Sequence, residues 1–305
     1  MIISMKSPIS GSSNTSKVLD IPAVRIIEGY RESFNIDVAE YFTDLEAVEV
    51  WQCLDTGYRF YAPHVNLEGK ADFYSALQKF PWYYMESKWE YGKALELIAP
   101  ACRVLEIGSG AGAFLKKLTH LNVSNVGLEV CEAAVARAKS AGISLLNMSL
   151  TDFALNHQSK FDVVCLFQVL EHIHAVAETV DSAIKLLNKD GKLLVSVPNN
   201  DSFISEDENC FLNMPPHHVG LWNESSLRKL ADYFPITVTN IFLEPMQSYH
   251  LRYFHQVRFG QALVKRFGFV GRLLSAFIYV MAFPILLMYS RRITGQTILV
   301  EFKRK

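Results

Sequence analysis

The clearest hydrophobic pattern in this chain lies between residues 103 and 200, where short apolar runs alternate with segments of helical periodicity. An unbroken apolar run bounded by turn residues is typical of a strand that is buried on both faces of a parallel sheet. Helical segments between such strands predict crossover connections. The sequence therefore predicts a doubly wound α/β domain with strands at 103–107, 125–130, 143–146, 161–168 and 192–197.

Two more strands are predicted after this region, at 236–243 and 297–302, where apolar and polar residues alternate. About fifty residues separate them, which is long for a connection inside a compact domain. We therefore expect a helical insertion with a structure of its own before the last strand.

The chain before residue 103 is expected to extend the α/β domain. Residues 48–61 alternate loosely around Asp55-Thr56-Gly57, which predicts a hairpin. In the aromatic-rich segment that follows, Pro81 is expected to begin a helix. The Ser-rich N-terminus predicts a disordered tail. The predicted boundaries are 1–17 for the tail, 18–80 for the hairpin and helical extension, 81–245 for the α/β domain, 246–294 for the insertion and 295–305 for the last strand.

A glycine-rich turn follows the first strand of the domain. Gly108, Gly110 and Gly112 lack Cβ atoms, so backbone amides and the N-terminus of the next helix can approach a ligand closely. The spacing of Gly108, Gly110 and Ala113 also fits the turn of dinucleotide-binding proteins. Glu106 favours another ligand, because a buried carboxylate needs a partner and would repel a pyrophosphate. A ligand with a cationic group would supply that partner.

The segment VLEIGSGAG around this turn resembles the first motif of the class I S-adenosylmethionine (SAM)-dependent methyltransferases. Two later segments, FDVVCLFQVLEHI and DGKLLVSVPNND, resemble the fourth-strand and fifth-strand motifs of methyltransferases similar to the ubiquinone-pathway O-methyltransferases. The resemblance implies a Rossmann-like sheet of seven strands with an antiparallel last strand, and SAM as the cofactor. SAM has an ammonium and a sulfonium group, which suit Glu106.

The turn and the resemblance together give a set of expected cofactor-binding residues. Glu129 lies 21 residues after Gly108, where an acid can accept the ribose hydroxyls, although it would equally suit a cap of the next helix. The resemblance places Asp152 against the adenine, and a turn cap is the alternative. Tyr84 is expected in a helical lid over the cofactor, with core packing as the alternative. The full set is Glu106, Gly108, Ser109, Gly110, Gly112, Glu129, Asp152, Gln168 and Tyr84.

Three histidines are the candidates for acid–base chemistry, because imidazole titrates near neutral pH. His172 follows the strand at 161–168 and is adjacent to Glu171. His217 and His218 lie in a loop that two prolines make stiff. Any of the three histidines is suited to take a proton from an acceptor hydroxyl. Glu171 and His172 alone are too few ligands for a divalent ion, so no metal site is predicted.

The predicted insertion has an unusual composition. It has no Asp or Glu between residues 245 and 300, several Lys and Arg, and an apolar run at 273–289. We expect a monotopic helical hairpin that bends at Pro284 and contacts the cytoplasmic leaflet through residues 251–292. A single span would place the last strand on the opposite side of the membrane from its sheet. The alternative is a helix buried in the core or at a homodimer interface.

Composition sets the remaining limits. The net charge of −1 gives no sign of nucleic-acid binding, and five cysteines without a C-x-x-C pair favour a reduced, cytoplasmic protein, at the inner face of the cell membrane if the insertion binds lipid. The preferred function is transfer of a methyl group from SAM to a small or lipid-linked acceptor, at oxygen, such as a quinone, a glycan or a secondary metabolite. The alternatives are an NAD-dependent oxidoreductase and a non-catalytic SAM-binding protein at the membrane surface.

Overall fold

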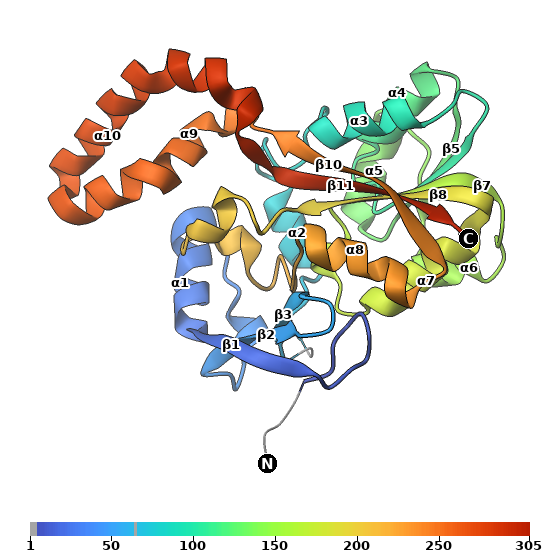
Figure 1. The fold of residues 1–305 in the computed structure, drawn as a ribbon, viewed down its shortest axis with the longest axis horizontal. Coiled ribbons are helices and arrows are strands. Elements are labelled where there is room, and N and C mark those ends of the chain that lie inside the picture. The colour runs from blue at the N-terminus through green and yellow to red at the C-terminus, as the bar shows by residue number, and fades with distance from the viewer. Residues whose placement is uncertain (1–4, 64–65) are drawn as a thin grey trace.

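The main sheet of the computed structural model has seven strands in the order β10-β11-β8-β7-β4-β5-β6 (Figure 1). The structure describes residues 5–63 and 66–305. Strand β11 runs antiparallel to both neighbours, and the remaining pairs are parallel. The predicted doubly wound sheet with an antiparallel last strand is therefore confirmed. Its strands are β4 (Arg103–Ile107), β5 (Ser124–Glu129), β6 (Leu146–Asn147), β7 (Phe161–Phe167), β8 (Leu187–Pro198), β10 (Ile236–Pro245) and β11 (Thr294–Arg304).

Helices cover both faces of this sheet, because alternate strand residues point to opposite sides. Leu105 and Val164 pack in the core beneath α7 and α8, whereas Val104 and Val163 pack in the core beneath α3 and α4. The helices of this domain are α3 (Trp89–Leu97), α4 (Ala113–His120), α5 (Glu132–Ser140), α6 (Leu150–Ala154), α7 (Val176–Leu186) and α8 (Glu224–Tyr233).

The N-terminal extension forms a second sheet with the order β1-β2-β3-β9. The predicted hairpin is present as β2 (Ala47–Cys53) and β3 (Arg59–Ala62), with α1 (Ala23–Phe34) and α2 (Ala71–Leu77) packed nearby. Strand β9 (Gly220–Leu221) comes from the chain just after His217 and His218 and pairs with β3. The extension therefore holds the histidine loop against the body of the protein.

The N-terminal segment differs from the disordered tail that its serines predicted. Ile9 is only 3% exposed and belongs to the main core, and the carbonyl of Pro8 accepts a hydrogen bond from the Ala177 amide. Strand β1 (Thr15–Pro22) then pairs with β2. The burial of Ile9 and the pairing of β1 with β2 therefore order a segment whose Ser-rich composition predicted disorder. Residues 1–4 of the predicted tail lie outside the described residues.

The segment that begins at Pro81 also differs from the prediction. It forms turns rather than a helix, and α3 begins only at Trp89, after Lys88 in an extended conformation. The turns direct Tyr83 and Tyr84 to the wall of the cavity described below. A regular helix would have distributed these adjacent rings around its axis.

The insertion is a helical hairpin that projects from the body of the molecule (Figure 1). It runs through α9 (Leu251–His255), a π-helical turn (Gln256–Gly260) and α10 (Gln261–Tyr289). Its two ends return to one place, because Pro245 of β10 pairs with Thr294 of β11. The chain therefore leaves the sheet and comes back, as the monotopic prediction requires.

The reversal of the hairpin lies at Gly268 and not at Pro284, so the predicted position of the bend is wrong. Gly268 has a φ of 54° and a ψ of −130°, whereas Pro284 lies within the helix. Glycine can adopt a positive φ, and proline, with φ fixed near −65°, cannot. Residues Ser248–Arg292 are long and apolar enough to cross a membrane, and only 6% of their most apolar window is buried.

Candidate functional site

A cavity of about 850 Å³ lies at the carboxyl ends of β4 and β7. The strand order changes direction between these two strands, and open α/β sheets bind their ligands at such a point. Much of the lining comes from five stretches of chain: the turn after β4, the segment 82–91, the turn after β7, the loop 207–218 and residues 249–253 at the start of the insertion.

The turn after β4 has the backbone that its glycines predicted. Gly108, Gly110 and Gly112 have φ values of 70°, 53° and 77°, which side chains other than glycine rarely adopt. A Cβ atom at Gly108 would lie 2.7 Å from Val169, and one at Gly110 would lie 2.8 Å from the Tyr84 ring. The turn therefore presents bare backbone to the cavity.

Glu106 lies just before this turn and is 2% exposed. Its Oε2 has no hydrogen-bond partner among the described residues, and its own carbonyl accepts the Ser109 hydroxyl. Burial raises the pKa of this carboxyl to about 8. Gly108 and Ser109, which follow it, line the cavity. A cation bound at the turn would supply the missing partner and favour the ionised carboxylate.

Glu129, at the end of β5, holds the same turn in place. One carboxylate oxygen accepts the Gly110 amide at 2.7 Å, and the other accepts the Cys131 amide at 2.8 Å. An ionised carboxylate has about four lone-pair sites, so both oxygens keep acceptor capacity for hydroxyl groups. The predicted ribose-binding role is compatible with this geometry.

Asp152 occupies a different place from the other expected cofactor residues. It is exposed on α6, where it accepts the Ser149 hydroxyl, and its amide donates to Ser149, as in a helix cap. It is not among the residues that line the cavity. Asn147, at the end of β6, is closer to the turn, because its side chain donates to the carbonyls of Glu129 and Val130. Sequence reasoning missed Asn147, although its position at the end of the third strand could have indicated it.

Two further expected residues, Tyr84 and Gln168, line the cavity. The Tyr84 ring lies over Gly110, and burial raises the pKa of its hydroxyl, which keeps it neutral. Gln168 follows β7 with a φ of 56°, and its amide donates to Glu90 at 3.5 Å. The nearby aromatic residue Trp89 is not among the residues that line the cavity, and it packs against the core beneath α3.

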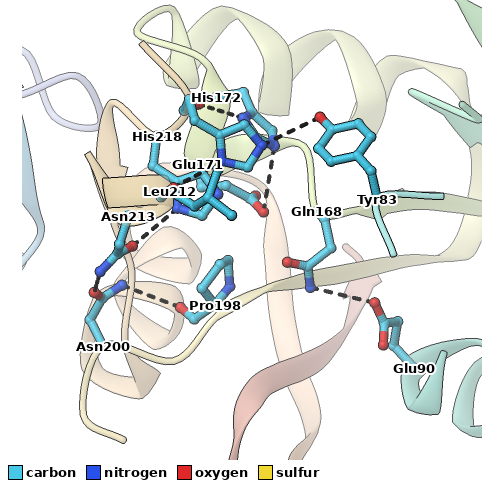
Figure 2. A network of polar contacts seen from close by, with 11 residues as sticks. Tyr83, Glu90, Gln168, Glu171, His172, Pro198, Asn200, Leu212, Asn213 and His218 are labelled. Carbon is cyan, nitrogen blue, oxygen red and sulfur yellow. Dashed lines mark hydrogen bonds and ion pairs between the residues drawn. The ribbon is translucent and has the colours of Figure 1, made fainter. Parts of the chain in front are cut away.

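The three candidate histidines form one cluster at the other end of the cavity (Figure 2). The His172 ring centroid lies 4.6 Å from that of His217 and 4.9 Å from that of His218, and the last two rings are stacked at 4.4 Å. Tyr83 points its hydroxyl at the cluster and lies 3.3 Å from Nε2 of His217. The structure thus joins residues that are 45 positions apart in sequence.

Burial governs the charge of this cluster. It lowers the pKa of His172 to about 4 and holds the pKa values of His217 and His218 well below their usual value, so all three imidazoles are neutral at pH 7. Glu171 is fully buried beside them, and burial raises its pKa to about 8. Neither carboxyl oxygen of Glu171 has a hydrogen-bond partner among the described residues.

Comparison with known proteins gives a consistent result. A family model described as a methyltransferase domain matches residues 58–270. A probable S-adenosylmethionine-dependent methyltransferase of Mycolicibacterium smegmatis is 33% identical over 131 residues, which are 42% of this chain and 49% of that protein. A ubiquinone biosynthesis O-methyltransferase of Aromatoleum aromaticum is 27% identical over 105 residues, which are 32% of this chain and 45% of that protein. The chain thus spans about half the length of the curated relatives it matches.

Among solved structures, a SAM-dependent methyltransferase from Archaeoglobus fulgidus aligns with a TM-score of 0.47 and 14% identity, over 78% of this chain and 95% of that one. The crystal structure of the [4+2]-cyclase SpnF aligns with a TM-score of 0.47 and 13% identity, over 73% and 85% of the two chains.

Proposed function

Because the chain belongs to the class I SAM-dependent methyltransferase family, we propose that it transfers the methyl group of SAM to an acceptor hydroxyl. The observation that supports this most strongly is the glycine turn with the buried Glu106 beside it, whose Oε2 has no hydrogen-bond partner among the described residues. The same cavity extends from this turn to the histidine cluster, so it has room for a donor at one end and an acceptor at the other.

The residues at the turn suit SAM better than a nicotinamide dinucleotide. Glu106 and Glu129 are two buried acids next to the turn, and both would oppose a pyrophosphate. Glu106 would balance the cationic groups of SAM, the turn amides would bind its carboxylate, and Glu129 would accept its ribose hydroxyls. Tyr84 would cover the cofactor from the cavity side. SAM supplies a methyl group that is already activated for displacement.

The protein's part in the transfer is mainly to position the two reactants and to exclude water. Residues 82–88 line the same cavity as the glycine turn and the histidine cluster. The neutral imidazoles of His172, His217 and His218 form the acceptor end of the cavity and would hold the acceptor hydroxyl there.

We infer further that the acceptor is lipid-linked and that the hairpin lies on an anionic membrane surface. Large apolar side chains are exposed along α10, most of all Phe269, Val270 and Met288. The segment 245–300 has no acidic residue, and its Lys and Arg would be attracted to anionic headgroups. Tyr249 and Tyr253, at the root of the hairpin, line the cavity. A lipid-linked acceptor would therefore reach the cavity directly from the membrane surface. On this proposal the protein acts at the cytoplasmic face of a membrane.

The function is tested with purified protein and SAM labelled in its methyl group. We expect calorimetric titration to show SAM binding without NADH binding, and label to move into the lipid fraction of a membrane extract. SAM binding without transfer to either lipid extracts or small hydroxylated acceptors would favour the non-catalytic alternative. NADH binding alone would overturn the proposal.

A further inference from the structure

We propose that His172, His217 and His218 form a binding site for a divalent transition-metal ion, most suitably Zn²⁺. One ring nitrogen from each histidine lies within 4.8 Å of the others. Tetrahedral coordination at 2.0–2.1 Å requires nitrogens separated by about 3.4 Å, so modest side-chain rotations would close the site. Only the role of the metal ion in methyl transfer rests on the proposed function, because metal binding itself needs no SAM.

The hydrogen bonds around the cluster fix which nitrogen of each ring is available. Nδ1 of His172 lies 2.6 Å from the carbonyl of His217, and Nδ1 of His217 lies 2.9 Å from the carbonyl of Leu212. A carbonyl can only accept, so both Nδ1 atoms carry the proton and donate. The lone pair of each ring is consequently on Nε2, and on His217 the Tyr83 hydroxyl lies 3.3 Å from it. Histidines that bind metals are usually oriented in this way, through a hydrogen bond from the other ring nitrogen.

His218 has the same orientation through a chain of side chains (Figure 2). The Asn200 amide donates to the carbonyl of Trp222, so the Asn200 oxygen faces Asn213 and accepts its amide at 2.7 Å. The Asn213 oxygen is then directed at Nδ1 of His218, 3.0 Å away, and must accept from it. Nε2 of His218 is left as the metal-binding nitrogen.

The ligand set and its surroundings favour a particular type of ion. Three imidazole nitrogens suit Zn²⁺ and similar transition metals, whereas Mg²⁺ prefers oxygen ligands. An oxygen of Glu171 lies 3.9 Å from Nε2 of His172, so this carboxyl group borders the proposed site.

The location of the cluster gives the ion a role. All three histidines line the cavity, so a fourth coordination position would face the acceptor, as in catalytic zinc sites. An acceptor hydroxyl bound there would release its proton to solvent more readily and would be oriented for methyl transfer. The metal would thus serve the acceptor end of the cavity, while the glycine turn serves the cofactor end.

The site is tested on the full chain after treatment with a chelator. Titration with Co²⁺ should give the visible absorption of a tetrahedral complex, at one ion per protein, and Zn²⁺ should displace it. His217→Gln and His218→Gln should each weaken binding at least about tenfold, since altering outer-shell partners alone costs 10–100-fold. His157→Gln is the matched control, because His157 stacks on Phe153 outside the cavity.

SAM titration on each preparation reports separately on folding and on the proposed function. A wild type that binds SAM but neither Co²⁺ nor Zn²⁺ at one ion per protein would overturn the metal site and leave the methyltransferase proposal standing. Unchanged metal affinity in a variant that carries both His217→Gln and His218→Gln would also overturn the metal site. Stoichiometric metal binding without SAM binding would support the site and contradict the cofactor proposal.

Discussion

The cofactor end of the cavity is built mainly from backbone within one short stretch, whereas the histidine end is built from side chains contributed by distant parts of the chain. At the first, Glu106 to Gly112 present bare amides and one buried acid. At the second, His172 meets His217 and His218 only because β9 joins the extension and two asparagines orient one of the rings. A local sequence motif is enough to indicate a site that is built from backbone. A site that is built from side chains of distant residues depends on the tertiary fold.

The largest expected effect comes from filling the backbone site. In Gly110→Arg, the new Cβ would approach the Tyr84 ring at 2.8 Å on a backbone with a φ of 53°, so SAM affinity should fall by at least about a hundredfold. Calorimetric titration measures this loss. Gly92→Ala is the control, because a Cβ at Gly92 meets nothing within 4 Å. Co²⁺ binding at the histidine end should be unchanged in both variants, and its loss in Gly110→Arg would show that the two ends are not independent.

The next effect concerns the acid behind the turn. Burial raises the pKa of Glu106 to about 8, so SAM affinity in the wild type should increase as the pH rises from 6 through 8 and then level off. Glu106→Gln should weaken SAM binding by roughly tenfold above pH 8 and remove this pH dependence. Calorimetry between pH 6 and 9 tests both statements. A wild-type affinity that does not change with pH would contradict the assigned role of Glu106.

The same pKa has a consequence for folding. A carboxyl whose pKa is higher in the folded chain than in the unfolded chain stabilises the fold only while it is protonated. Its contribution to the free energy of unfolding is complete below about pH 4.5 and is lost as the pH rises toward 8. As the pH rises over this range, the urea concentration at the midpoint of unfolding should therefore fall less for Glu106→Gln than for the wild type.

A smaller effect is expected at the hairpin, which would bring acceptors to the histidine end. Phe269 is 73% exposed on the hairpin, and Leu155 is 73% exposed on the α/β body. Phe269→Asp should reduce binding to vesicles of 70% phosphatidylcholine and 30% phosphatidylglycerol by about tenfold, whereas Leu155→Asp should not. Flotation measures the bound fraction. Absence of wild-type binding, together with a dimer in light scattering, would assign the hairpin to an interface between two copies of the chain.

The contrast between the two ends also explains how far the sequence could be interpreted. The strands and the glycine turn were predictable because apolar runs and a local motif determine them, and the family match agrees. The meeting of the three histidines could not be predicted, because nothing local relates His172 to residues 45 positions later.

Other differences have the same origin in tertiary structure. Pro284 was predicted as the bend of the hairpin, but the chain reverses at Gly268, which has a positive φ. The Ser-rich N-terminus was expected to be disordered, and the burial of Ile9 against the α/β core orders it. Asp152 matched a motif position, but Asn147 is the residue whose side chain contacts the end of β5. These contacts depend on the tertiary fold and cannot be predicted from composition or residue spacing.

The smallest expected effect distinguishes a metal site from a purely hydrogen-bonded histidine cluster. Since Nδ1 of His217 donates to Leu212, the Tyr83 hydroxyl must donate to the Nε2 lone pair that a metal would use. Tyr83→Phe removes this competitor, so Co²⁺ affinity should increase about two- to tenfold, the value of one hydrogen bond. Tyr74→Phe, which keeps its ring contact with His172, is the control. If Tyr83 instead served only to hold the cluster together, its loss would loosen the ligands, and Co²⁺ affinity would fall. An increase in Co²⁺ affinity would therefore show that Nε2 of His217 is available to an ion, and a decrease would show that its hydrogen bond to Tyr83 maintains the cluster.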